Sequence, residues 1–155
     1  MDRRTFLAMV PGSLLTAPLP VRAQPAGKVL PGDPAPRKVM LELQQALAHA
    51  IERFQAMDEA GVLSHVSDHY RTDPLTKPAI RDQLRVMFTL YDTLRAQVRI
   101  DEARTSGERA WVYSTGEVSG RLRYLGTWTP ILSWQHELEV VQREQGVWRL
   151  YGYQQ

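Results

Sequence analysis

The chain has 155 residues, of which 43% are hydrophobic and 23% are charged, and it contains no cysteine. This length suits a single domain that buries an apolar core without cross-links. The lack of cysteine excludes disulfide exchange, thiolate metal sites, iron–sulfur clusters and thioether-linked haem. We expect no cofactor.

The first 23 residues predict an export signal. The pair Arg3-Arg4 stands one residue before Phe6-Leu7, and a moderately apolar stretch follows as far as Pro20. This stretch is too short and too broken to span a bilayer, which takes about 20 apolar residues. Small side chains precede a plausible cut after Ala23. The pattern predicts a twin-arginine signal peptide over residues 1–23 and a periplasmic protein.

The net charge depends on this segment. The whole chain is formally +2, but residues 1–23 contain three arginines against one aspartate, so the other 132 residues carry 16 basic and 16 acidic side chains. A neutral chain lacks the positive field that attracts nucleic acid or anionic membranes. We therefore expect no nucleic-acid partner and, after signal cleavage, no membrane association.

Three helices are expected after a linker. Residues 24–36 hold six prolines and glycines, which indicates a linker before a domain over residues 37–155. Apolar residues then recur every three or four positions from Arg37 to about Ala60, predicting an amphipathic helix that Gly61 stops. Residues 62–70 predict a short second helix. A third helix is expected from Pro78 to about Leu94.

After residue 95 the apolar pattern alternates, which predicts strands. A hairpin turn at 106–108 joins the first strand to one over 110–120, and a long strand over 131–143 turns at 144–146 into a last strand over 147–153. Residues 121–130 are less regular. Helices followed by an antiparallel meander favour an α+β domain in which one curved sheet wraps the long helix.

Several short motifs give this order a family likeness. They are Met57–Leu63 at the end of the first helix, Ser67–Arg71 before the third, and the strand starts Gly107–Val112 and Gly146–Leu150. With them the chain resembles the nuclear-transport-factor-2-like (SnoaL-like) superfamily, in an exported bacterial subgroup, over roughly residues 40–153. The resemblance implies a cone-shaped fold shared with ketosteroid isomerase and scytalone dehydratase. These motifs mark fold positions and no reaction.

Strand alternation selects a candidate catalytic residue. If Ala110 and Val112 face the core, so do Ser114, Gly116 and Val118, and on the last strand Trp148 and Leu150 face in. On the long strand, the apolar face formed by Leu132, Trp134, Leu138 and Val140 carries His136 inside with it. One interpretation makes His136 a general acid or base, with Asp58 orienting it or acting itself and Tyr91 donating to an oxyanion. The other makes His136 a hydrogen-bonded core residue, Asp58 a helix end and Tyr91 a packing ring.

The resemblance to ketosteroid isomerases implies an acidic base inside the cone. The same alternation puts Glu117, Glu137 and Glu139 on outward positions, which argues against isomerase chemistry. The cluster of His65, Asp68 and His69 suggests a metal site by spacing alone, and we interpret it as a solvated surface patch with no metal.

Aromatic residues suggest a ligand site and a lid. The side chains expected to contact a small apolar ligand are Phe54, Phe88, Trp111, Trp128 and Trp134. The segment 122–130, which contains Tyr124 and Trp128, could fold over the cone as a lid, contact another protein, or simply pack as a loop.

Three functions follow from these residues. The first is a non-catalytic, exported protein that binds a small apolar ligand or a protein partner. The second is an isomerase, dehydratase or hydrolase that uses His136 for proton transfer. The third is a homodimer formed through the outer sheet face, where Tyr113, Thr115, Tyr151 and Tyr153 make a semi-apolar patch.

Overall fold

The computed structural model describes residues 31–153, so the predicted signal peptide lies outside the described residues. Its helices are α2 (Arg37–Gln55), α3 (Glu59–Leu63) and α4 (Lys77–Leu90). Its strands are β1 (Asp33–Pro34), β2 (Arg71–Thr72), β3 (Leu75–Thr76), β4 (Tyr91–Ser106), β5 (Arg109–Leu122), β6 (Trp128–Glu144) and β7 (Val147–Leu150). Within this range no helix is long and apolar enough to cross a membrane.

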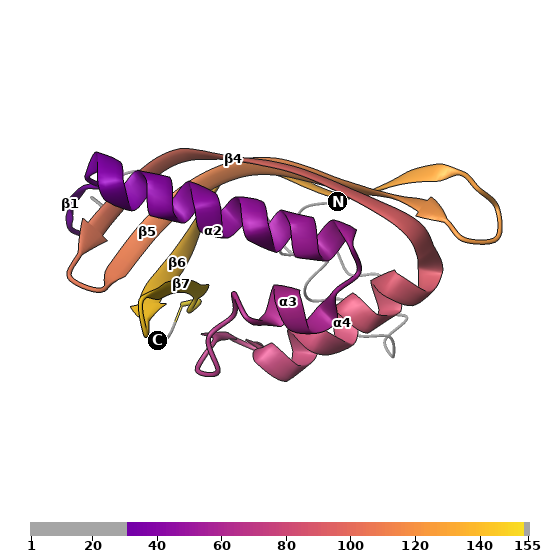
Figure 1. The fold of residues 1–155 in the computed structure, drawn as a ribbon, viewed down its shortest axis with the longest axis horizontal. Helices are drawn as coiled ribbons and strands as arrows, with labels where there is room; N and C mark the ends of the chain where they lie inside the picture. The colour runs from indigo at the N-terminus through magenta and orange to yellow at the C-terminus, as the bar shows by residue number, and fades with distance from the viewer. Residues whose placement is uncertain (1–30, 154–155) are drawn as a thin grey trace.

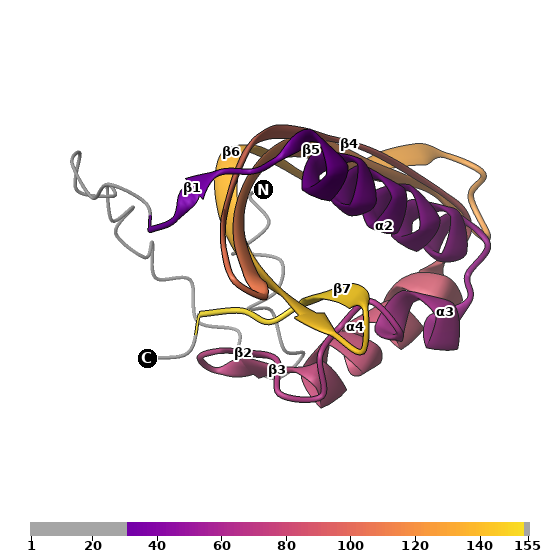
Figure 2. The same cartoon turned by 60° about the vertical axis from the view of Figure 1, so that its left-hand side comes forward.

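One curved antiparallel sheet forms the body of the molecule. Its strand order is β1-β4-β5-β6-β7, and β2 and β3 form a separate two-stranded hairpin. The three long strands arch over α2, while α3 and α4 lie below one end of that helix (Figures 1 and 2). The predicted α+β class, with helices packed on a curved antiparallel sheet, is confirmed.

The first helix ends earlier than its apolar pattern predicts. Helix α2 stops at Gln55, and Met57 adopts a positive φ of 56° that turns the chain. Asp58 then caps α3, because its side chain accepts a hydrogen bond from the Gly61 backbone N–H at 2.9 Å. A polar cap, which helical periodicity does not report, therefore ends the predicted first helix early and begins α3 at Glu59. Helix α3 ends at Leu63, well before the predicted end at residue 70.

The third helix also ends early, at Leu90 and not Leu94, because Tyr91 already begins β4. The Arg123 guanidinium donates to the carbonyl oxygens of Phe88, Thr89 and Tyr91, which satisfies the open end of α4. The Tyr91 ring lies over Gly120, where an added Cβ would come within 2.4 Å of the ring. Glycine is required there by the close approach.

Half of the irregular segment 121–130 is strand. Strand β5 continues to Leu122 and β6 begins at Trp128, so residues 123–127 alone connect the two. The resulting hairpin tip projects past α4, away from the helices (Figure 1). Of the alternatives for this segment, the lid over the cone is wrong, because continued strand pairing carries it outward.

The N-terminal segment touches the sheet before α2 begins. Asp33 and Pro34 pair with Thr105 and Arg104 of β4. The Arg104 guanidinium also donates to the Gly32 carbonyl oxygen at 2.7 Å. The last residues of the predicted linker are thus fixed on the edge strand.

A β-bulge in β6 reverses the predicted alternation. Gly116 pairs with Trp134, but Ser114 pairs with Glu137, so Gln135 and His136 together face Thr115. His136 has a φ of 48°, and its side chain is 58% exposed. Because one residue is added, the faces exchange beyond this point. The inward positions of Leu132 and Trp134 are confirmed, and those predicted for His136, Leu138 and Val140 are wrong.

The bulge is held by the Thr115 hydroxyl. It accepts from the His136 backbone N–H at 3.1 Å and donates to the Asp101 carboxylate at 2.6 Å. Asp101 itself sits at a second irregularity, between Ile100 and Glu102 of β4. On the outer face the His136 ring stacks on Tyr113, with ring centroids 4.1 Å apart.

The positive φ at His136 predicts that substitutions there rank in stability in the opposite order to that of an ordinary strand position. His136→Gly should be more stable than His136→Val by about 1–2 kcal/mol, because a β-branched side chain is strained in the left-handed region. Urea unfolding of the two variants measures the difference. In a regular strand the order would reverse, since valine favours extended backbone. A more stable His136→Val would therefore contradict the bulge.

Candidate functional site

A cavity of about 310 Å³ lies between the helices and the concave side of the sheet. Its wall is mostly apolar and is formed mainly by side chains of α2, α4, β4, β5, β6 and β7. Examples are Leu47, Ala50 and Phe54 of α2 and Val98, Val112 and Leu132 of the sheet. The volume falls at the lower end of the range of small-molecule sites.

A few polar side chains interrupt this apolar wall. They are His65, Gln83, Ser114 and Glu139. Ser114 is 6% exposed, and its Oγ accepts a hydrogen bond from the Trp134 indole N–H at 3.1 Å. Because the indole fills one acceptor site of the hydroxyl, the hydroxyl proton can point toward a guest in the cavity.

Glu139 reaches the cavity because of the bulge. It pairs with Val112, whose side chain also lines the cavity, and residues opposite each other in an antiparallel pair share a face. Glu137 likewise pairs with Ser114. The prediction that both glutamates face outward is wrong, because it assumed unbroken alternation through residues 135–136.

His65 joins the wall from the segment after α3. Its Nε2 lies 2.6 Å from Nδ1 of His49 on α2, so one imidazole donates and the other accepts. Partial burial, then the neighbouring His49 and Arg149, lower the pKa of His65 below its ordinary value. His65 is therefore neutral at neutral pH and can either donate or accept.

The Trp148 side of the wall is fixed by a carboxylate on α2. Glu42 accepts from the Trp148 indole N–H at 3.0 Å and from the Arg143 guanidinium at 2.6 Å. These hydrogen bonds hold the pKa of Glu42 below its ordinary value, and the one from the Trp148 indole has the largest effect. The brace joins α2 to β6 and β7. Sequence reasoning missed it because Glu42 occupies the polar side of the helical pattern.

The predicted catalytic residues do not meet. His136 lies on the outer face of the sheet, with its Nδ1 3.6 Å from the Asp101 carboxylate. Asp58 caps α3 and contacts Arg53, and the Tyr91 ring covers Gly120. None of the three lines the cavity. The bulge therefore removes the geometric premise for chemistry by His136 inside the cone.

Two of the five predicted ligand contacts, Phe54 and Trp134, line the cavity. Phe88 lies behind Phe54, with ring centroids 6.1 Å apart. Trp111 falls between two inward residues of β5 and so faces outward. Trp128 stands at the base of the hairpin tip beneath the Arg95 guanidinium. Trp148 and Leu150 do line the wall, as the alternation in β7 predicts.

The residues of the predicted outer patch, and those of the suggested metal cluster, each contact a different partner. Tyr113 stacks on His136, Tyr151 lies beneath Arg109, and the Tyr153 hydroxyl donates to the Leu138 carbonyl oxygen. Asp68 pairs with Lys77 at 2.7 Å, whereas His65 turns to the cavity. Across residues 31–153, no three histidine or acidic side chains converge on a point where a metal could bind.

No family model matches this sequence, and no curated protein matches it. Solved structures, by contrast, match its fold. A conserved protein from Planctomyces limnophilus has a TM-score of 0.67 at 15% identity, over 76% of this chain and 94% of its own. A ketosteroid isomerase-like protein from Erwinia carotovora has a TM-score of 0.58 at 19% identity, over 75% of this chain and 93% of its own.

A member of the nuclear-transport-factor-2-like family from Streptomyces avermitilis gives a TM-score of 0.58 at 11% identity, covering 76% of this chain and 95% of that one. The chain thus has the nuclear-transport-factor-2-like fold that its motifs suggested. At these identities the likeness establishes the fold and leaves the chemistry to the side chains.

The lowered pKa of His65 predicts a specific pH dependence of stability. The folded protein binds this proton less readily than the unfolded chain, so stability should fall as the pH drops below the ordinary value of 6.5. His65→Gln should reduce the loss of unfolding free energy between about pH 7 and about pH 5. The exposed His69→Gln is the matched control. Equal losses in both variants would contradict the assignment.

Proposed function

We propose that this protein binds a small, mainly apolar molecule in the cavity between α2, α4 and the concave sheet. The observation that carries the proposal is the cavity itself, which is large enough for a small organic molecule and lined almost entirely by apolar side chains. Core packing normally leaves few voids larger than a water molecule. A retained void of this size supports binding as its purpose.

The polar side chains on the wall define the guest further. Ser114 can donate a hydrogen bond, Glu139 can accept one, and His65 can do either. A guest that carries an oxygen atom could form a further hydrogen bond with these side chains, which a purely apolar guest could not. We therefore propose a ligand with an apolar skeleton and at least one hydroxyl or carbonyl oxygen.

A second function, proton transfer, is favoured by the inward turn of Glu139. A carboxylate on an apolar wall can remove a weakly acidic proton from a bound molecule, and the Ser114 hydroxyl can stabilise an oxygen that gains negative charge. This proposal replaces His136 with Glu139 as the base. The likeness to a ketosteroid isomerase-like protein is consistent with it at the level of fold.

Where the protein acts is proposed from the sequence alone. Arg3-Arg4, the short apolar stretch and the small residues ending at Ala23 support export by the twin-arginine route. A domain without cysteine needs no oxidising compartment to fold, so it can fold before export. The ligand would then be one found outside the cytoplasm.

Filling the cavity should abolish binding. Ala50→Phe places a ring in the cavity, whereas Ala48→Phe places the same ring on the exposed side of the same helix. Fluorescence titration with the neutral apolar probe N-phenyl-1-naphthylamine should show at least roughly ten-fold weaker binding for Ala50→Phe and little change for Ala48→Phe. Equal binding by both variants would contradict the proposed site.

The proton-transfer proposal can be tested without knowing the natural substrate. The ring opening of 5-nitrobenzisoxazole begins with removal of one C–H proton, so it reports a carboxylate base in an apolar site. We expect catalysis by the unmodified chain and a loss of about 100-fold or more in Glu139→Gln. His136→Gln should keep the rate. An unmodified chain no faster than Glu139→Gln would rule out this function for Glu139.

A further inference from the structure

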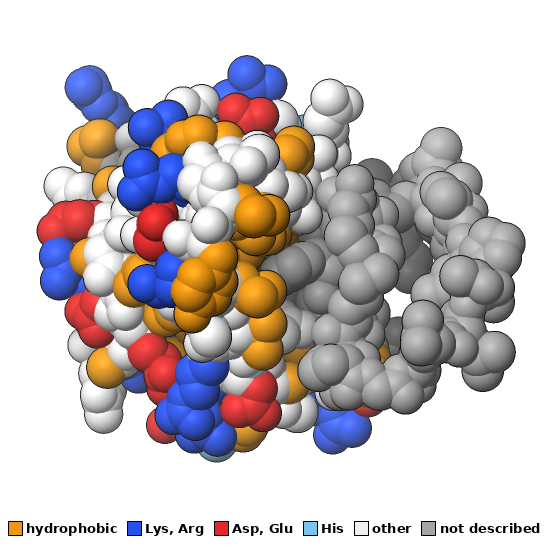
Figure 3. Space-filling view, turned by 90° about the vertical axis from the view of Figure 1, so that its right-hand side faces the viewer, with side chains coloured by type: hydrophobic (Ala, Val, Ile, Leu, Met, Phe, Trp, Pro, Cys, Tyr) orange, Lys and Arg blue, Asp and Glu red, His pale blue; other side chains and the backbone are white. Residues whose placement is uncertain are grey.

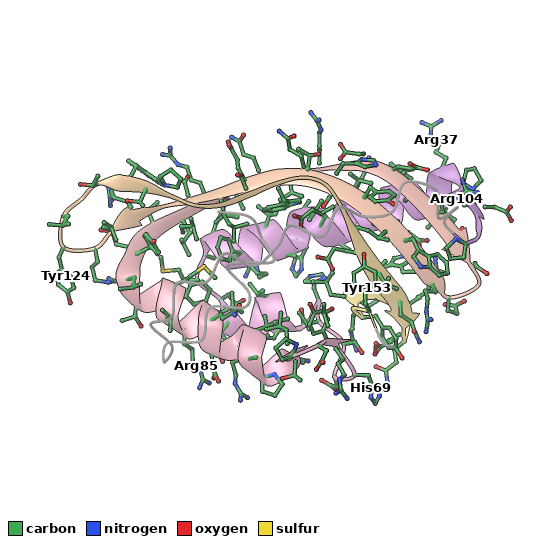
Figure 4. The ribbon with its side chains drawn as sticks, turned by 180° about the vertical axis from the view of Figure 1, so that it is seen from behind. Arg37, His69, Arg85, Arg104, Tyr124 and Tyr153 are labelled. Carbon is green, nitrogen blue, oxygen red and sulfur yellow. The ribbon has the colours of Figure 1, made fainter. Side chains whose placement is uncertain are left out.

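The end of the molecule at the β5–β6 hairpin has an unusual surface. Of the seven large apolar side chains that stand out from the surface of residues 31–153, five belong to α4 or to this hairpin. They are Val86, Leu90, Tyr124, Leu125 and Trp128, with Tyr124 93% and Leu125 76% exposed. Figure 4 shows Tyr124 at the far tip, clear of the helices.

Basic side chains surround these apolar ones. Arg121 and Arg123 belong to the hairpin, and the Arg95 guanidinium lies 4.1 Å from the Trp128 ring centroid. The segment 119–130 contains no acidic residue. Asp92, which pairs with Arg121 at 2.8 Å, is the acidic partner among them, so Arg95, Arg121 and Arg123 against Asp92 leave a local charge of +2. Figure 3, which views this end, shows apolar side chains with both basic and acidic ones among them.

We propose that this hairpin tip, residues 121–128 with Arg95, docks the protein on the surface of an anionic phospholipid bilayer. Tyrosine and tryptophan favour the boundary between headgroups and acyl chains, because each has an apolar ring and a polar atom. Leu125 would enter the apolar side of that boundary, and the arginines would meet the phosphates. The proposal does not depend on the ligand in the cavity.

The shape of the tip favours a lipid surface over a protein partner. A stable protein interface buries about 800 Å² on each side with closely matched shapes. A two-stranded hairpin that projects alone offers a small convex surface, which suits a soft headgroup layer better. Two of the three arginines have internal contacts that leave their charge in place, since Arg123 contacts carbonyl oxygens and Arg95 an aromatic ring. Arg121 is paired with Asp92.

This docking differs from the expectation based on total charge. A chain with equal numbers of acidic and basic residues has no long-range attraction to a membrane, but screening limits such attraction to about 10 Å in any case. What matters at contact is the charge within that distance of the tip. The excess of positive charge is local to the tip, so it does not appear in the net charge of the whole chain.

Vesicle flotation tests the proposal directly. The chain from residue 24 onward should be used, because the apolar stretch before it would bind lipid by itself. It should float with phosphatidylcholine vesicles that contain about one third phosphatidylglycerol, and bind pure phosphatidylcholine and high-salt samples at least roughly ten-fold less. The double variant Tyr124→Ser/Leu125→Ser should lose binding. Leu41→Ser, which removes an exposed leucine elsewhere, should keep it.

A fluorescent probe then reports insertion. Because the chain has no cysteine, Leu125→Cys can carry an environment-sensitive label at the tip alone, and Ser106→Cys carries it at the β4–β5 turn, at the opposite end of the sheet. Emission should shift to the blue with anionic vesicles at the tip and not at Ser106. No flotation, or flotation that survives the double variant, would overturn the proposal. A protein partner at the tip would then be the better hypothesis.

Discussion

The Thr115 hydroxyl controls which side chains this fold can use. By binding the His136 backbone N–H and the Asp101 carboxylate, it holds two bulged strands together at one level of the sheet. The extra residue in β6 exchanges the faces of the strand beyond it. His136 therefore lies on the outside, and Glu139 lies on the cavity wall. One local hydrogen-bonded irregularity decides whether the cavity contains an imidazole or a carboxylate from β6.

That constraint explains which predictions succeeded. The α+β class, the order of the three helices and four main strands, and the inward faces of β5 and β7 followed from periodicity, because burial of one face imposes it over many residues. The short strands β1, β2 and β3 were not predicted. The inward serine on β5 and the indole on β7 were therefore found. Element ends were less accurate, since they depend on single hydrogen bonds. Asp58 capping α3 and Arg123 closing α4 are two examples.

The site was predicted less well than the fold, for a physical reason. A bulge adds one residue, and every later assignment to a face is then reversed. No glycine marks it here: the left-handed position is His136, a residue type that alternation alone treats as an ordinary strand position. The one available signal was a conflict. Regular alternation gave the cavity no carboxylate and buried a histidine between apolar neighbours, and a shift of one residue near Gln135 would have resolved both.

Glu139 and the brace at Glu42 show how the fold can hold charged groups beside an apolar void. Glu42 is satisfied by Trp148 and Arg143, so the wall keeps its shape without a guest. Glu139 shares a wall with Ser114, whose hydroxyl already accepts one hydrogen bond from the Trp134 indole. Larger apolar side chains at these positions would fill the void, since protein cores are normally close-packed. A guest of the proposed kind would instead occupy the void and contact the polar side chains on its wall.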